Sequence, residues 1–293
     1  MQIGIVGMGI MGRAMAARLG EKGHTVRVWN RTRATAEAGG LPVMDTPAAL
    51  AAASDVIFSV VTDPAAVASV TLGPEGILAG LTADGVHADM STVAPDAARR
   101  MAAEYERQGR RFVQAPVLGS KRQIESGTLL VFAGGTTEDT ERCEVAWASL
   151  AERVWRFPTV EQAASAKLAC NLLIGHLIVG LGQSLLFGQQ NGIAPETLLE
   201  ILAASALGCP MFASKGTKIL DRDFDANFFV RHMLKDLTLA ADAGQQSRTP
   251  LPLNALTREL FVAADAQGSG TEDYSAVVKV LERLAGAELR RGG

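Results

Sequence analysis

The sequence predicts an α/β protein, with a doubly wound, mostly parallel sheet over residues 1–160 and an all-helical domain over residues 161–293. Short β-branched runs alternate with alanine-rich stretches in the first half, which is typical of such sheets. A glycine-rich turn directly follows the first run. Near residue 161 this pattern stops, and long alanine- and leucine-rich segments follow. A chain of 293 residues with 48% hydrophobic residues is large enough for two domains.

Six segments of the first half have the composition of strands. They are QIGIVG (2–7), TVRVWN (25–30), DVIFSVV (55–61), GVHADMS (85–91), RRFVQAPV (110–117) and TLLVFAGG (128–135). The segment between the first two, IMGRAMAARLGEKG, is predicted to be a helix that ends at Gly23.

Gly7, Gly9 and Gly12 form the pattern GxGxxG between the first strand and this helix. The first glycine permits a tight turn, the second lets backbone amides approach a pyrophosphate, and the third allows close packing of helix on strand. The helix N-terminus adds partial positive charge. We therefore predict a dinucleotide-binding Rossmann domain, although a glycine-rich structural turn would have the same spacing. The predicted contacts in this turn are Gly7, Met8, Gly9, Ile10, Met11 and Gly12.

The end of the second strand indicates which dinucleotide binds. NAD sites usually place an Asp or Glu here to bind the ribose 2′-hydroxyl, whereas this chain reads Asn30, Arg31, Thr32. A guanidinium group can bind a 2′-phosphate bidentately, and the neutral neighbours can add hydrogen bonds. NADP(H) is therefore preferred over NAD(H), unless Arg31 and Arg33 are solvated loop charges.

Two later turns follow strands at the edge where such sheets bind ligands, VVTDPAAV (60–67) and ADMSTVAP (88–95). Small hydroxyl residues and a proline in each are expected of a loop held in one shape beside a cofactor, or of an ordinary helix cap. The cofactor contacts predicted here are Val61, Thr62, Asp63, Val67 and Thr92.

The second half should be all-helical, with breaks at NGIAP (191–195), LGCP (207–210), SRTPLP (247–252) and QGSGTED (267–273). Its first helix is predicted over about 161–190, with an αL cap at Asn191 and Gly192. Although this stretch is as apolar as a membrane span, polar residues interrupt it and no basic or aromatic belt flanks it. We interpret it as a buried central helix, in which four glycines permit close helix contacts: Gly175, Gly180, Gly182 and Gly188.

Lys167 and Asn171 are four residues apart on this helix and therefore lie on one face. A lysine that extends to solvent near a helix start would be an ordinary structural explanation. His176 lies on another face and is expected to be a buried histidine with a structural hydrogen bond.

Charge and cysteine usage exclude several classes of protein. The net charge of −3 gives no basic field for nucleic acid, and the N-terminus lacks the positive region of a signal peptide. Three cysteines without metal-ligand spacing suit a reducing cytoplasm, so we expect neither disulfides nor a metal. Neither nucleic acid nor a membrane is an expected partner.

Several stretches together resemble the β-hydroxyacid dehydrogenase family. They are GIVGMGIMGRAMAARL, VWNRT, VTDP, DMSTV, APVLGS, SGTLLVFAGG, AKLACNLL and HMLKD, and their order fits over essentially the whole chain. Within the family, GSKRQIESGTLLVFAGG, PMF at 210–212 and FFVRHMLKDLTLA look most like glyoxylate and succinic semialdehyde reductases. The resemblance implies a Rossmann domain, a long interdomain helix, and a helical domain that binds substrate and forms homodimers or homotetramers.

The resemblance also implies roles for individual residues. Lys167 matches the catalytic lysine, and Asn171 matches the amide beside it. The implied reaction is hydride transfer from a nicotinamide to an aldehyde or ketone, with Lys167 as the proton donor, a contribution typically of about 10² to 10⁴-fold. Thr92 matches a threonine near nicotinamide and substrate, Lys235 a cofactor contact, and Phe228 and Asp236 positions that line the substrate site.

One position departs from the family pattern. The family uses a serine after Pro-Val to hold the substrate carboxylate, but this chain reads Leu118, Gly119, Ser120. Because leucine donates no hydrogen bond, carboxylate binding would depend on backbone amides, on Ser120, or on Lys121 or Arg122. A reductase of small aldehyde or keto acids is therefore predicted, with an imine reductase or a reductase of non-carboxylate carbonyls as the alternative. A non-catalytic, dimeric NADP-binding module is the alternative of another class.

Overall fold

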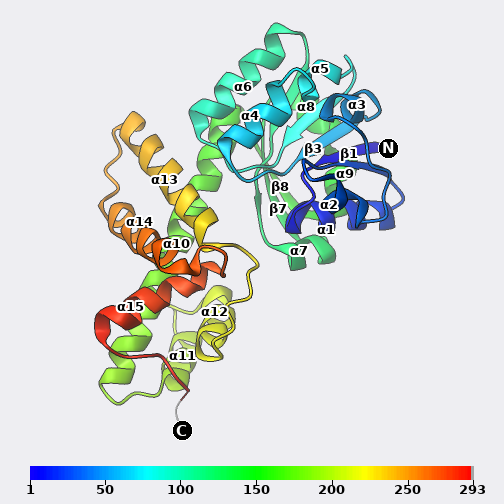
Figure 1. Cartoon of the computed structure of the whole chain (residues 1–293). Helices are drawn as coiled ribbons and strands as arrows, with labels where there is room; N and C mark the ends of the chain where they lie inside the picture. Colours follow the sequence, from blue (N-terminus) through cyan, green and yellow to red (C-terminus); the bar gives the residue numbers. More distant parts are fainter. Residues whose placement is uncertain (292–293) are drawn as a thin grey trace. The chain divides into compact units, whose positions relative to one another are not determined.

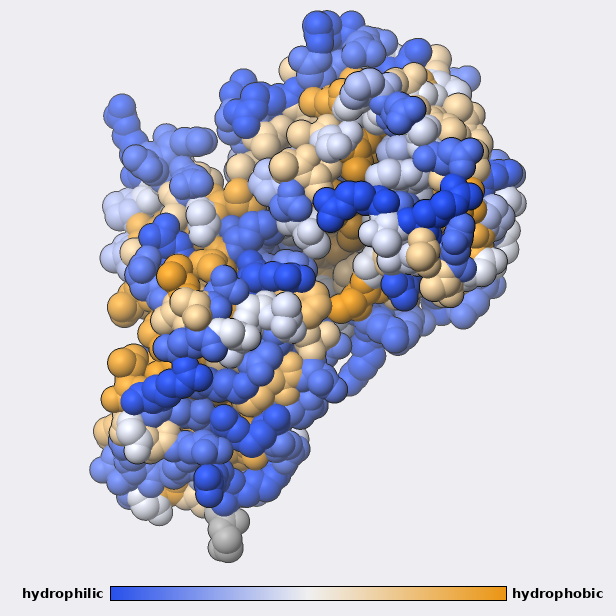
Figure 2. Space-filling model, in the orientation of Figure 1, coloured by the Kyte–Doolittle hydropathy of each residue, from blue (hydrophilic) through white to orange (hydrophobic). Residues whose placement is uncertain are grey.

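The computed structural model describes residues 1–291 and divides the chain into two compact units, Met1–Leu168 and the residues from Ala169 onward. The first unit is a sheet with helices on both faces, and the second is helical (Figure 1). The predicted fold class is thereby confirmed. The two units divide within a long helix, whereas the sequence-based division lies at its start. The face seen in Figure 2 is mostly hydrophilic, with scattered apolar residues.

The sheet of the first unit has eight strands in the order β2-β1-β3-β4-β5-β7-β6, with β8 beside β7. Neighbours among β1 to β5 are parallel, β7 is antiparallel to β5 and β6, and β8 is parallel to β7. The strands are β1 (Gln2–Val6), β2 (Thr25–Trp29), β3 (Val56–Ser59), β4 (Val86–Asp89), β5 (Arg111–Gln114), β6 (Val117–Leu118), β7 (Leu129–Gly134) and β8 (Ala151–Phe157).

Each of the six predicted segments contains a strand, and RRFVQAPV is divided into β5 and β6. Strand β8 was not predicted, because its sequence AERVWRF carries three charged, exposed residues and lacks an apolar run. It pairs along β7 over six positions, so pairing with a neighbour overrides its composition.

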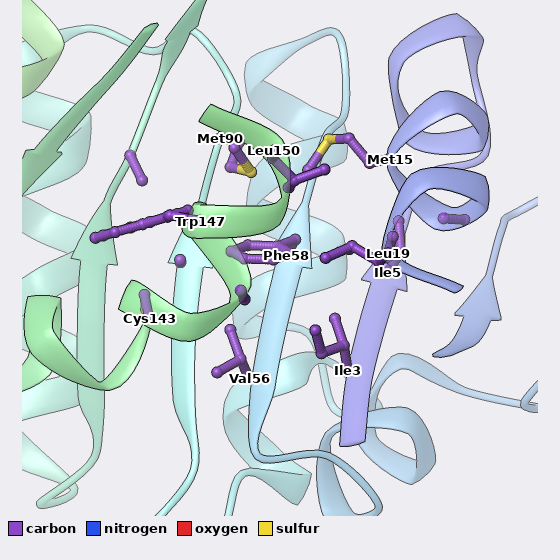
Figure 3. Close-up of a cluster of buried hydrophobic side chains, with 14 of the residues drawn as sticks. Ile3, Ile5, Met15, Leu19, Val56, Phe58, Met90, Cys143, Trp147 and Leu150 are labelled. Atoms are coloured by element: carbon purple, nitrogen blue, oxygen red, sulfur yellow. The ribbon is translucent and has the colours of Figure 1, made fainter. Parts of the chain in front are cut away.

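Two hydrophobic cores cover the two faces of this sheet. Alternate residues of a strand point to opposite faces, so Phe58 packs in one core and its neighbour Ile57 in the other. Figure 3 shows Phe58 in the first core with Trp147 and Leu19, which come from helices on that face. The helices of this unit are α1 (Ile10–Glu21), α2 (Arg33–Glu37), α3 (Pro47–Ala52), α4 (Pro64–Leu72), α5 (Ile77–Gly80), α6 (Pro95–Arg107), α7 (Lys121–Ser126), α8 (Thr137–Arg142) and α9 (Glu144–Leu150).

Helix α10 (Val160–Gln190) leads into the second unit and ends where predicted, with Gly192 at a φ of +83°. The predicted breaks separate the helices that follow, although QGSGTED forms part of a π-helical turn. These elements are α11 (Pro195–Ala204), α12 (Pro210–Leu220), α13 (Val230–Ser247), α14 (Pro252–Ala264), the π-helix η1 (Asp265–Ser269), the 3₁₀-helix η2 (Tyr274–Val277) and α15 (Val278–Ala285).

Three of the four glycines of α10 allow close helix contacts. A Cβ on Gly182 would lie 3.0 Å from Leu281, and Gly175 and Gly188 are similarly close to leucines. Gly180 differs from the prediction, because no non-neighbouring atom of the described residues lies within 4 Å of its Cβ position. Helix α10 is long and apolar enough to cross a membrane, but core helices of soluble proteins also pass that test, and 44% of its most apolar stretch is buried.

Candidate active site

The turns after β1 to β5 begin at one level of the sheet. The last residues of these strands are register partners: Val6 pairs with Trp29 and Ser59, Ser59 with Asp89, and Asp89 with Gln114. Because the strands are parallel, their carboxyl ends form one edge, and open sheets of this kind bind ligands there. The turns predicted to contact the cofactor follow β1, β2, β3 and β4 at this edge.

The turn after β1 holds three glycines that differ in the space around them. A Cβ on Gly7, whose φ is +99°, would lie 2.3 Å from the Val60 carbonyl oxygen, and one on Gly12 would lie 1.9 Å from that of Gly7. Beside Gly9, no non-neighbouring atom of residues 1–291 lies within 4 Å. Backbone packing thus requires glycine at two positions, whereas Gly9 leaves the N-terminus of α1 open to a ligand.

The Asn30 side chain joins this turn to the turn after β2. Its Oδ1 accepts a hydrogen bond from the Met8 N–H at 2.9 Å, and its Nδ2 donates to the Thr32 carbonyl oxygen at 3.0 Å. The Met8 side chain is buried, whereas Ile10 is exposed and Met11 is half-buried. Asn30 and Met8, both predicted cofactor contacts, therefore also maintain the shape of the glycine turn.

The two arginines after β2 have different surroundings. Arg33 Nε lies 2.8 Å from Glu37 Oε1, and its Nη1 lies 2.8 Å from Asp45 Oδ1. Arg31 is exposed and forms no ion pair with any residue that the structure describes. Of the two guanidinium groups, Arg31 is the one available for an incoming anion.

The turn after β3 is a helix start. Asp63 caps α4, since its Oδ1 accepts a hydrogen bond from the Ala66 N–H at 2.8 Å. This is the ordinary cap role considered for it from the sequence. Val67 is only 3% exposed and packs in a core, whereas Thr62 is exposed. The solvent-exposed part of this turn is therefore its middle, residues 62–65.

The turns after β3 and β4 are joined directly. The Val61 N–H donates to Ser91 Oγ at 3.1 Å, and Ser91 is buried. Thr92, the next residue, is half-buried. The structure thus brings Val61 and Thr92, two predicted cofactor contacts, to neighbouring turns of one edge.

The segment predicted to hold a carboxylate lies at the end of β6. Leu118 is half-buried and pairs with Leu130 of β7. Gly119 has a φ of +141°, which favours glycine. Ser120 caps α7, and both its N–H and its hydroxyl donate to Gln123 Oε1, at 2.9 and 2.6 Å. Its hydroxyl proton is therefore already used within the chain.

Helix α10 carries the lysine and the amide four residues apart. Both side chains are buried, with Lys167 9% and Asn171 3% exposed. Asn171 Nδ2 donates to Asp236 Oδ2 of α13 at 2.5 Å. The other carboxylate oxygen of Asp236 lies 2.8 Å from Lys235 Nζ. The buried Asp236 carboxylate thus fixes the orientation of the Asn171 amide, because a carboxylate only accepts hydrogen bonds.

Phe228 lies just before α13, half-buried between two rings. Its ring centroid is 5.8 Å from that of His232 and 6.1 Å from that of Tyr274. Burial, aided by nearby Arg231, lowers the pKa of His232 to about 4, so this histidine is neutral near pH 7.

His176 differs from its prediction. It is half-buried, and its Nε2 forms no hydrogen bond to any residue in the range 1–291. Burial lowers the pKa of this histidine, so the ring is neutral and behaves mainly as an apolar group.

A buried polar group under the candidate site was not predicted. It comprises Ser59, His87, Asp89 and Tyr105, all fully buried. The signal in the sequence is weak, since each polar residue stands singly within the apolar segments DVIFSVV and GVHADMS or in a helix. Among residues 1–291 no group of three or more His, Cys, Asp or Glu is placed to hold a metal ion.

Comparison with known proteins gives two family matches that together span most of the chain. Residues 2–158 match the NAD binding domain of 6-phosphogluconate dehydrogenase. Residues 162–281 match the family described as NAD-binding of NADP-dependent 3-hydroxyisobutyrate dehydrogenase.

Two relatives match the chain over nearly their whole length. The chain is 32% identical to 2-(hydroxymethyl)glutarate dehydrogenase of Eubacterium barkeri, covering 99% of this chain and 98% of that one. It is 31% identical to glyoxylate/succinic semialdehyde reductase 1 of Arabidopsis thaliana, covering 96% and 99%. The fold matches a crystal structure of 3-hydroxyisobutyrate dehydrogenase from Salmonella typhimurium with a TM-score of 0.85, at 24% identity over 95% and 99% of the two chains. The chain therefore belongs to the β-hydroxyacid dehydrogenase family and is an NAD(P)-dependent enzyme that acts on CH–OH groups.

Proposed function

We propose that this enzyme reduces a small aldehyde or keto acid, of the glyoxylate or succinic semialdehyde type, with NADPH, and that Lys167 is the general acid. The observation that carries the proposal is the buried Lys167 ammonium, one helical turn before an amide whose orientation is fixed by Asp236. The similarity to the Arabidopsis reductase supports the substrate class.

The residues at the carboxyl edge of the sheet fit a dinucleotide. Gly9 leaves open space at the N-terminus of α1, whose first turn carries no acidic residue to repel a pyrophosphate. Arg31 lies in the turn where a 2′-phosphate would bind and has no carboxylate partner among the described residues, which supports NADPH over NADH. When bound, NADPH supplies a hydride to the carbonyl carbon.

A side chain of the protein supplies the proton that the carbonyl oxygen needs. Lys167 Nζ–H is proposed to donate to the carbonyl oxygen as that oxygen gains negative charge, and the neutral amine then regains a proton from solvent. Asn171 Nδ2 is bound to Asp236, so Asn171 Oδ1 is the atom that can accept a hydrogen bond from the ammonium or from a substrate hydroxyl. Asp236 and Lys235 would then act mainly by holding this amide.

Recognition of the substrate carboxylate is proposed to depend on Arg122 and on backbone amides. Leu118 offers no donor, and Ser120 uses its hydroxyl proton in a helix cap. Lys121 pairs with Glu125 at 3.5 Å. Arg122 is exposed and has no ion pair within residues 1–291. Because Leu118 replaces a polar group, a non-carboxylate carbonyl or a cyclic imine is the second candidate substrate.

A substrate panel tests the proposal. Glyoxylate, succinic semialdehyde, a neutral aldehyde of similar size and a cyclic imine are assayed with NADPH and with NADH. We expect an aldehyde acid with NADPH to give the highest kcat/KM, and Leu118→Ser to raise it by about tenfold, the value of one hydrogen bond to a charged group. A higher kcat/KM for the imine or the neutral aldehyde would reject the proposed substrate class.

We also propose that the second unit forms a homodimer or homotetramer. It exposes several large apolar side chains. The most exposed of them are Leu173, Phe187, Ile201, Leu207, Leu253, Leu256 and Leu284. Light scattering should give a mass at least twice 30.8 kDa. A variant with Phe187→Glu, which is 71% exposed here, should shift that mass toward the monomer.

A further inference from the structure

The buried polar group beneath the carboxyl edge forms one continuous chain of hydrogen bonds. Tyr105 OH lies 2.7 Å from His87 Nδ1, and His87 Nε2 lies 2.7 Å from Ser59 Oγ. Ser59 Oγ donates to Asp89 Oδ1, also at 2.7 Å. None of the four residues has exposed surface, so these hydrogen-bonded side chains are shielded from solvent and cannot contact substrate directly.

The direction of these bonds follows from the number of protons. The Ser59 hydroxyl donates its one proton to Asp89, so it can only accept a hydrogen bond from His87. Burial lowers the pKa of His87 to about 3, so the ring carries a single N–H, which must lie on Nε2. His87 Nδ1 therefore accepts from the Tyr105 hydroxyl. Each of the three hydrogen bonds, from Tyr105 to His87, from His87 to Ser59 and from Ser59 to Asp89, is therefore donated in the direction of Asp89.

The Asp89 carboxyl group at the end of the chain holds the next turn. Its Oδ1 also accepts a hydrogen bond from the Ser91 N–H at 3.1 Å. Burial raises the pKa of Asp89, partly offset by hydrogen bonds from Ser59 and Ser91, so the group tends toward its neutral form. No charged residue contributes to this shift, and His87 and Tyr105, the titratable groups that face it, are neutral.

Ser91 links the turn after β4 to the turn after β3. Its Oγ accepts from the Val61 N–H at 3.1 Å. From β5, Gln114 Nε2 donates to the carbonyl oxygens of both Asp89 and Ser91 at 3.0 Å. Residues 89–91 are therefore held to β3, to β5 and to the turn after β3.

A hydrophobic core at this position would not require these buried polar side chains. Apolar side chains of similar volume would fill the same space without the cost of burying polar atoms. Even so, Asp89 Oδ2 and Gln114 Oε1 have no hydrogen-bond partner among residues 1–291. The buried polar atoms lie beneath the turns after β3 and β4, which contain Val61 and Thr92. We therefore expect the unfavourable burial of these atoms to be offset by a functional role in those two turns.

We propose that Asp89 is a positioning residue for the cofactor site: it holds Ser91, and through Ser91 it fixes the spacing between the turns that carry Val61 and Thr92. The inference rests on the proposed function only in assigning those two turns to the cofactor. Asp89 itself touches neither cofactor nor substrate.

The test measures NADPH affinity by fluorescence titration, together with Tm, for variants of the full chain. Asp89→Ala should raise the Kd about ten- to a hundredfold, because small misplacements of a positioned group have effects of that size. Asp89→Asn offers the same oxygen to Ser59 and Ser91 and should stay within about threefold of wild type. If Asp89→Ala does not fold, Ser91→Ala, which removes the acceptor of the Val61 N–H, should still raise the Kd several-fold.

Ser54→Ala is the matched control. It deletes a buried hydroxyl that donates to the Leu50 carbonyl oxygen at 2.7 Å, before the amino end of β3, and should lower Tm without changing Kd. A wild-type Kd in Asp89→Ala or in Ser91→Ala would reject the positioning role, as would an Asp89→Asn variant impaired as much as the alanine variant. Absence of turnover with aldehyde acids would reject the proposed function but not this inference, because the titration needs no substrate.

Discussion

Gly9 and Gly12 lie three residues apart, but substitution by alanine should lower ligand affinity at Gly9 and protein stability at Gly12. A Cβ on Gly12 would lie 1.9 Å from the Gly7 carbonyl oxygen, a backbone atom that cannot move without displacing α1 from β1. Overpacking of this kind costs about 1–3 kcal/mol and occasionally more, so we expect Gly12→Ala to lower the free energy of unfolding by about 3 kcal/mol.

Gly9→Ala should affect ligand binding instead. Gly9 has φ −75° and ψ −162°, which alanine adopts without strain, and no non-neighbouring atom of residues 1–291 lies within 4 Å of its Cβ position. Loss of glycine at a helix cap costs at most about 1 kcal/mol. The new methyl group would occupy the side on which a pyrophosphate approaches, so NADPH affinity should fall at least about tenfold, or 1.4 kcal/mol.

Chemical denaturation and NADPH titration of the same preparations separate the two effects. Gly20→Ala in α1 is the matched control, because nothing lies near that Cβ position either, but Gly20 lies near the other end of the helix from the glycine turn. It should stabilise the protein by up to about 1 kcal/mol and leave the affinity unchanged. Wild-type affinity in Gly9→Ala, or wild-type stability in Gly12→Ala, would refute the assignment of the glycine roles.

Three further predictions concern charge. Arg31→Ala should raise KM for NADPH at least about tenfold and leave KM for NADH nearly unchanged, whereas the paired Arg33 tolerates alanine; equal effects on both cofactors would exclude a 2′-phosphate role. Between pH 6.5 and about 3, His87 binds a proton only in the unfolded state, so wild-type stability should fall with decreasing pH by up to about 1.4 kcal/mol per unit from this residue. An unchanged slope in His87→Gln would contradict that. Asp273→Ala leaves the Lys215 ammonium buried without its partner at 2.7 Å and should cost about 3–5 kcal/mol in urea unfolding; a loss below 1 kcal/mol would contradict the ion pair.

Regular patterns made most of the fold predictable from sequence. Apolar, β-branched runs predicted strands β1 to β7, and Gly and Pro marked the helix ends. Strand β8 has neither signal, because Glu152, Arg153 and Arg156 face solvent at its exposed positions. Its strand conformation is set by pairing with β7, which is a long-range property.

The candidate site was predictable as a set of segments, but the use of individual atoms was not. The sequence pattern pointed to Asn30 and Ser120 as ligand contacts, yet both side chains make hydrogen bonds within the protein, Asn30 to the turn after β1 and Ser120 in its own helix cap. Whether a polar side chain is used locally depends on backbone geometry that spacing alone does not specify. The link from Asp236 to Asn171 spans 65 residues and likewise has no local signal.

The most direct test of the central claim is a single-turnover measurement of NADPH oxidation by Lys167→Ala, with the best substrate of the panel. General acid catalysis by this lysine predicts a rate about 10² to 10⁴-fold below wild type, with the Kd for NADPH nearly unchanged. Lys218→Ala, an ordinary lysine on α12 paired with Asp223, should retain the wild-type rate. A Lys167→Ala rate within about threefold of wild type would show that the buried ammonium is structural and would contradict the proposed mechanism.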